Sequence, residues 1–176
     1  MKWKTGFFWA SFFLFLTVSH CYKGHGLNPN PQDSNFTGIR GHITFIGTWP
    51  DSTKEVRVAV LSQYPRGITH PDSLMGFVLQ NLVAFSDTIP RFVQSYDYEL
   101  PLEPGTYEWV LVAWFPDIPL YLLGVKELGA YYRNPGSSIP MPVRVLPGVA
   151  VEGIDIVADF QNVFRQIPFF KTRGKP

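Results

Sequence analysis

Cysteine is the residue type that this chain uses least, and charged side chains are also sparse. The 176 residues include one cysteine, Cys21, and only 16% are charged. A single cysteine excludes an intramolecular disulfide and argues against a zinc site with cysteine ligands. Sixteen prolines and fifteen glycines argue against long helices and helical bundles. With 45% hydrophobic residues, the chain is too apolar to be disordered and long enough for one domain with a core.

The longest apolar run lies near the N-terminus and is too short to span a bilayer. Lys2 and Lys4 precede an almost unbroken apolar stretch at residues 6–18, whereas a spanning helix needs about 20 residues. The pattern is typical of a signal peptide, which we predict over residues 1–20. Its removal leaves thirteen of the fifteen basic side chains against fourteen acidic ones, a formal charge of −1. We therefore expect no nucleic-acid partner.

The single cysteine directly follows this stretch. Leu16 to Cys21 (Leu-Thr-Val-Ser-His-Cys) resembles the lipobox of bacterial lipoproteins, except that His20 stands where the pattern has a small residue. The resemblance implies that Cys21 is acylated and holds the protein on a membrane through several acyl chains. Tyr22 follows instead of aspartate, which implies the outer membrane, with the domain facing the periplasm. The alternative is that Cys21 is an incidental free thiol near an ordinary cleavage site.

The remaining chain divides into a tether (residues 21–37), a domain (38–162) and a tail (163–176). The tether is rich in Gly, Pro, Asn and Ser, and the domain is dominated by apolar residues at alternating positions, as in half-buried strands. Residues 74–85 fit both a helical stripe and a strand, and we favour a strand plus a loop. Turn-forming residues separate the runs, which predicts an antiparallel all-β sandwich. The predicted strands are residues 39–45, 55–60, 92–100, 107–115, 122–132, 143–146 and 151–160.

Three segments carry a resemblance to a known family. Leu100 to Tyr107 is similar to the L-P-P-G-x-Y turn of carboxypeptidase-regulatory-like domains, with two residues interposed. Val143 to Gly148, followed by residues 153–156, looks like the final strands of these domains, and residues 38–45 resemble their opening strand. The resemblance covers residues 38–160. It implies a seven-stranded Greek-key antiparallel β-sandwich of the transthyretin-like or Ig-like kind.

The turn and the strand after it give two more precise expectations. Pro104-Gly105 forms a tight turn and is expected to place Tyr107, Trp109, Leu111 and Ala113 on one face. Residues 107–115 are apolar on nearly both faces, which predicts a central strand.

Residues that carry catalysis are scarce after the predicted signal peptide. His25, His42 and His70 do not have metal-ligand spacing, and no G-x-S-x-G motif is present. The C-terminal segment also shares only Arg-Gly with the tail of the transthyretin-like hydrolases acting on 5-hydroxyisourate, so that assignment is rejected. We predict no catalytic residue, no cofactor and no metal.

Aromatic residues outside the regular strands are the best candidates for contact with a ligand or partner. Trp49 lies in a predicted turn, and Tyr131 and Tyr132 are adjacent, so only one of them can face inward from a strand. Exposed aromatic rings stack on sugars or anchor protein partners.

These observations predict an exported, lipid-anchored β-sandwich of the bacterial cell envelope, with a non-catalytic role in binding or envelope assembly. Its expected partners are the membrane, through the N-terminal lipid, and an unidentified envelope protein or glycan. The alternative is a carbohydrate- or peptide-binding module that uses the loop aromatics, and a hydrolase is the third hypothesis.

Overall fold

Strands make up most of the fold. The computed structural model describes residues 36–68, 70–134, 137 and 139–164. The predicted signal peptide (1–20), Cys21 and most of the tether (21–37) lie outside the described residues, as do residues 135–136 of one predicted turn and most of the tail (163–176). The strands are β1 (Gly38–Ile46), β2 (Thr53–Leu61), β3 (Leu82–Phe85), β4 (Ser95–Pro101), β5 (Gly105–Tyr107), β6 (Trp109–Pro116), β7 (Lys126–Ala130), β8 (Val143–Val145), β9 (Ala150–Val151) and β10 (Ile156–Asp159).

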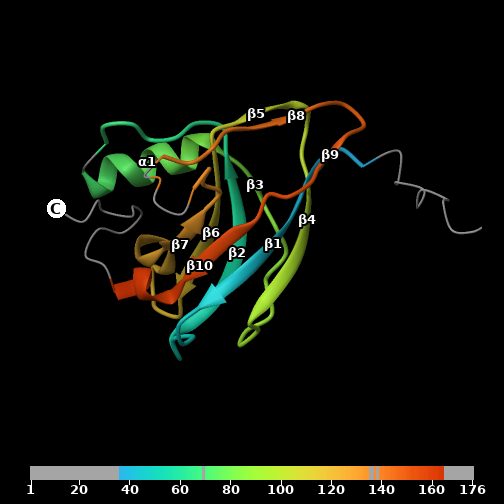
Figure 1. Ribbon diagram of the computed structural model, residues 1–176. Helices are drawn as coiled ribbons and strands as arrows, with labels where there is room; N and C mark the ends of the chain where they lie inside the picture. The colour runs from blue at the N-terminus through green and yellow to red at the C-terminus, as the bar shows by residue number, and fades with distance from the viewer. Residues whose placement is uncertain (1–35, 69, 135–136, 138, 165–176) are drawn as a thin grey trace, which may run out of the picture. The chain divides into compact units, whose positions relative to one another are not determined.

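These strands form two four-stranded sheets and a short ribbon. In the first sheet β1 lies between β10 and β4, and β9 also pairs with β1. The second sheet has the order β3-β2-β6-β7, and β5 pairs with β8 (Figure 1). The described part of the chain also has one α-helix, α1 (Pro71–Asn81), and two short 3-10 helices, η1 (Tyr121–Gly124) and η2 (Phe160–Phe164). Each predicted strand range overlaps an observed strand, so the prediction of a mostly β fold is confirmed.

The main core lies between the two sheets. Alternate residues of each strand point toward the opposite sheet, as strand geometry requires. The first sheet contributes Ile43 and Ile156, and the second contributes Val58 and Val112, all fully or almost fully buried. The sheets therefore pack face to face, and this packing buries the apolar half of each alternating pattern.

A second apolar cluster covers the other face of the β3-β2-β6-β7 sheet. Trp109, Leu111 and Ala113 of β6 point to this side, where Leu74 of α1 packs with them. All eight residues of β6 are buried, because one sheet face meets the first sheet and the other meets α1 and η1. The prediction of a central strand buried on both faces is confirmed. We call this second side the helical face of the sheet.

The preference for a strand plus a loop at residues 74–85 is wrong for most of that stretch. Pro71 starts α1, where proline fits the first helical turn. Leu74 and Val78 are one helical turn apart and both pack on the helical face. The chain becomes extended only at Leu82, where β3 begins. Burial against the sheet selected the helical alternative, and the sequence pattern alone does not contain this information.

Two expectations about strand pairing are also corrected. The sandwich is not wholly antiparallel, because β1 pairs in parallel with both β9 and β10. Tyr107 does not share a face with Trp109: it lies in β5, which pairs with β8, and it packs in the main core. Regular strand pairing stops at Glu108 between them. There the Glu108 carboxylate accepts a hydrogen bond from the backbone N–H of Tyr64 (3.1 Å).

Candidate apolar binding site

The helical face contains a cavity between α1, η1 and the sheet. Its volume is about 80 Å³, counted as the space open to the centre of a water molecule. Every residue that lines it is apolar or aromatic. We call it the helical-face cavity, and it is lined by Ala59, Leu61, Met75, Val78, Leu79, Leu82, Phe85, Trp109, Leu111, Ala113, Phe115, Leu122 and Val125.

Two alanines in the sheet make room for this cavity. Ala59 of β2 lies opposite Leu111 and Ala113 of β6 lies opposite Arg57, so the two methyl groups are diagonal neighbours on the helical face. Each is only 3% exposed. Their short side chains leave space that a larger residue would fill.

The rim of the cavity is apolar and open to solvent. Leu79 of α1 is 62% exposed, Phe85 of β3 is 41% exposed and Leu122 of η1 is 47% exposed. The three residues come from three different elements around the opening. Contiguous exposed apolar surface next to an apolar cavity is typical of a ligand or partner site.

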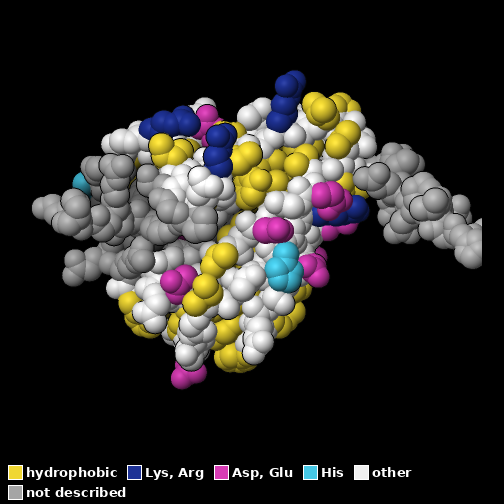
Figure 2. Space-filling view, in the orientation of Figure 1, with side chains coloured by type: hydrophobic (Ala, Val, Ile, Leu, Met, Phe, Trp, Pro, Cys, Tyr) yellow, Lys and Arg dark blue, Asp and Glu magenta, His cyan; other side chains and the backbone are white. Residues whose placement is uncertain are grey.

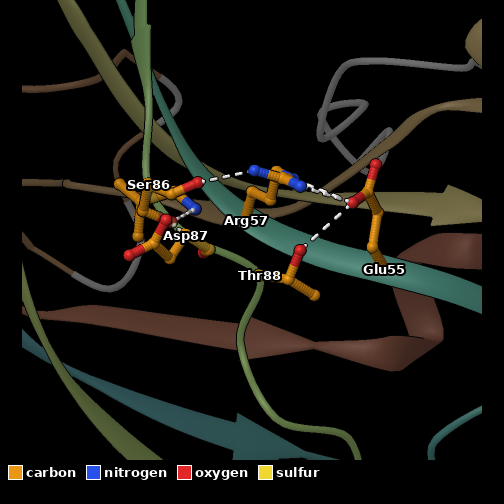
Figure 3. A network of polar contacts seen from close by, with 6 residues as sticks. Glu55, Arg57, Ser86, Asp87 and Thr88 are labelled. Atoms are coloured by element: carbon orange, nitrogen blue, oxygen red, sulfur yellow. Dashed lines mark hydrogen bonds and ion pairs between the residues drawn. The ribbon is translucent and has the colours of Figure 1, made fainter.

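A polar network fixes the segment that follows β3 (Figure 3). The guanidinium of Arg57 contacts the Glu55 carboxylate at 2.8 Å and donates to the carbonyl oxygen of Ser86 at 2.9 Å. The Ser86 hydroxyl accepts a hydrogen bond from Val58 N–H (2.9 Å) and donates to the Asp87 carbonyl (2.7 Å). Because Ser86 follows Phe85 directly, this network positions one side of the rim and leaves the Arg57 charge compensated.

A lysine lies beside the wall formed by η1. The Lys54 ammonium is 3.6 Å from the centre of the Tyr121 ring, a cation–π contact. The Tyr121 ring packs against Phe115 at 6.3 Å, and Phe115 packs edge-on against Phe85 at 5.9 Å between ring centres. These contacts connect an exposed positive charge to two residues that line the cavity.

A buried carboxylate also lies on the helical face. Glu127 of β7 is 6% exposed and accepts a hydrogen bond from the Tyr132 hydroxyl at 2.9 Å. Burial, and secondarily the negative charge and hydrogen bond of Glu127, raise the pKa of Tyr132. Burial likewise raises the pKa of Tyr64, whose ring packs edge-on against Trp109 at 5.4 Å. At neutral pH these phenols therefore stay protonated.

The outer face of the first sheet is polar. Arg40 on β1 pairs with Glu99 and Glu152, and His42 Nδ1 lies 2.6 Å from the Asp97 carboxylate. Figure 2 shows acidic side chains gathered with a histidine over β1 and β4. The Asp97 side chain is 89% exposed, and exposed pairs of this kind contribute about 0–1 kcal/mol to stability. We interpret this face as a solvated surface.

The aromatic residues singled out from the sequence are packed against the core. Trp49 is only 8% exposed, and its ring N–H donates to the Val93 carbonyl at 3.1 Å. Tyr131 packs against the main core and Tyr132 against the helical-face cluster, and both are partly buried. The expectation that one tyrosine of the pair is exposed is wrong, because both faces of this sheet are covered. Trp49 therefore has little exposed ring surface, whereas Tyr131 and Tyr132 keep part of theirs exposed.

The residues that form the cavity do not stand out in the sequence. Ala59 and Ala113 each interrupt a run of larger apolar residues in their strands. Small residues on the same face of neighbouring strands are a pattern that marks such a space, but the pairing of β2 with β6 must be known to see it. Lys54 carried no distinguishing pattern at all.

Comparisons with known proteins identify no relative. No profile of a known protein family matches the chain, and neither a curated protein nor a solved structure is significantly similar to it. Within the described residues, no group of three or more His, Cys, Asp or Glu side chains is arranged to hold a metal ion. No helix in that part of the chain is long and apolar enough to cross a membrane.

Proposed function

We propose that this protein is an exported, lipid-anchored binding domain that takes an apolar ligand into the helical-face cavity. The observation that carries the proposal is the cavity itself, which is lined only by apolar or aromatic residues and bordered by the exposed Leu79, Phe85 and Leu122. Ligand pockets are mostly apolar, with a few polar groups at their edge.

The composition of the lining favours binding over catalysis. No lining residue carries a carboxylate, imidazole, hydroxyl or thiol, whereas acid–base or nucleophilic catalysis needs such a group within reach of the substrate. Glu55 and Arg57, on the strand that contributes Ala59 to the lining, are bonded to each other.

Export, membrane attachment and family membership rest on the sequence. The stretch at residues 6–18 and the lipobox-like segment ending at Cys21 support a lipoprotein of the bacterial cell envelope. The resemblance of residues 38–160 to carboxypeptidase-regulatory-like domains supports a Greek-key, transthyretin-like sandwich.

The binding proposal is tested with a brominated neutral chain, 10-bromodecanol, added to the full protein. Bromine quenches tryptophan fluorescence at short range. Trp109 lines the cavity, whereas Trp49 and Trp114 belong to the main core. We expect 10-bromodecanol to quench the wild-type fluorescence saturably. In Trp109→Phe most of this quenching should disappear.

Two further variants test the cavity: one fills it, and the other is a control at a distant site. Ala113→Leu fills the floor of the cavity and should weaken binding at least tenfold, provided that circular dichroism shows native folding. Val157→Leu, at an exposed site on β10 in the other sheet, should bind as the wild type does. Absence of saturable quenching in the wild type, or equal quenching in Trp109→Phe, would refute a ligand site in this cavity.

A further inference from the structure

We propose that the ligand is a single-chain anionic amphiphile, a free medium-chain carboxylic acid, with its alkyl chain in the helical-face cavity and its carboxylate beside Lys54. This inference rests on the proposed function and specifies the chemical class of the ligand. Its basis is the size of the cavity together with Lys54, whose ammonium contacts the ring of Tyr121 in η1, the element that also contributes the lining residue Leu122.

The size of the cavity fits one alkyl chain. About 80 Å³ is open to the centre of a water molecule, which is more than the space of about 10–15 Å³ that one buried water needs. The cavity therefore has room for part of a single narrow alkyl chain. The exposed rim residue Leu122, next to Tyr121 in η1, offers apolar surface to the outer carbons of that chain. A chain of medium length contacts both the cavity and its rim.

The charge at the η1 wall selects an anionic head group. Lys54 contacts the Tyr121 ring, and no carboxylate lies within ion-pair distance of it among the described residues. Glu55, its neighbour in sequence, is paired with Arg57. A ligand carboxylate at this position meets an uncompensated ammonium that the aromatic ring holds in place. A cationic head group would be repelled.

The test compares three ligands with the same ten-carbon chain: decanoate, decanol and decyltrimethylammonium. Each competes with 10-bromodecanol for the full protein below its micelle concentration, and recovery of Trp109 fluorescence gives the affinity. We expect decanoate to bind more tightly than decanol and decyltrimethylammonium to bind most weakly.

Variants of the lysine isolate the charge. Lys54→Gln should weaken decanoate about two- to fivefold, as loss of an exposed ion pair predicts, and should leave decanol unchanged. Lys54→Arg keeps the charge and should retain decanoate binding. Arg144→Gln removes an exposed cation from β8, in the separate β5–β8 ribbon, and should have no effect.

The outcomes separate this inference from the proposed function. Equal affinity for decanoate and decanol, or a loss of decanoate binding in Arg144→Gln as large as in Lys54→Gln, overturns the anionic ligand and leaves an apolar site. Failure of all three ligands to displace 10-bromodecanol overturns the alkyl-chain ligand itself. If 10-bromodecanol does not bind either, the proposed function fails with it.

Discussion

Glu127 and Tyr132 show how single residues acquire a role that their sequence neighbourhood does not reveal. Glu127 follows Lys126 in a stretch where apolar and polar residues do not alternate regularly. Its carboxylate is nevertheless buried and accepts a hydrogen bond from the hydroxyl of Tyr132. A buried carboxylate requires donors, because its unpaired burial costs several kcal/mol. Tyr132, which the sequence suggests as a contact with a ligand or partner, is one of these donors.

This pair predicts a specific alkaline instability. The pKa of Tyr132 is about 10 in the unfolded chain and is raised in the folded protein by burial and by Glu127. Its contribution to stability is therefore fully present below pH 10 and decreases as the pH rises toward the folded pKa. Tyr132→Phe should make this fall in the free energy of unfolding shallower by up to about 1.4 kcal/mol per pH unit.

The measurement is urea denaturation at several pH values between 8 and 11. Tyr98→Phe should act in the same direction, because burial raises the pKa of Tyr98, whose hydroxyl donates to the Ile154 carbonyl at 2.7 Å. Between pH 8 and 9 neither substitution should change the slope. An unchanged slope above pH 10 in Tyr132→Phe would show that this phenol titrates normally in the folded state.

At the scale of secondary-structure elements, one glycine permits two strands of different sheets to approach. A Cβ at Gly129 of β7 would clash with the carbonyl oxygen of Val157 in β10. These strands are not hydrogen-bonded neighbours, since β7 belongs to the second sheet and β10 to the first. The missing side chain therefore determines how closely the sheets meet at this edge.

We predict that Gly129→Ala destabilises the protein by about 1–3 kcal/mol or more, because the new methyl group forces the strands apart. Gly76→Ala is the matched control. Gly76 lies inside α1, and among the described residues no atom beyond its chain neighbours and the helix's own backbone lies within 4 Å of a Cβ at this position. Alanine should therefore stabilise the helix by about 0.5–1 kcal/mol. Urea denaturation measures both. Equal stability of the two variants would contradict the close approach of β7 and β10.

The helix α1 illustrates why periodicity alone does not decide between a helix and a strand. Leu74, Val78 and Phe85 fit more than one periodicity in sequence, and the choice depends on the surface that receives them. Because the β3-β2-β6-β7 sheet has a second apolar face, a helical stripe gains burial there. The same face explains why Tyr132 is partly buried, whereas Tyr131 packs against the main core.

At the scale of the whole molecule, membrane attachment is the property that the sequence predicts and the described residues do not include. Metabolic labelling with a palmitate analogue, followed by membrane fractionation, tests it. We expect wild-type protein to carry the label and to sediment with one membrane, and Cys21→Ala to lose both properties. Unlabelled, soluble wild-type protein would show that Cys21 is not a lipid attachment site.

The sequence by itself determined the β-rich class, the approximate positions of the strands and the central place of residues 107–115. These properties follow from alternation and from turn residues, which act over a few neighbours. Alternation of apolar residues predicts which side chains are buried, but it does not predict which element packs against them. Only the tertiary structure decided the helix over residues 71–81, the parallel pairing of β1 with β10 and the burial of Trp49. The helical-face cavity belongs to this second group, because it requires Ala59, Ala113 and Leu122 from three separate segments to meet.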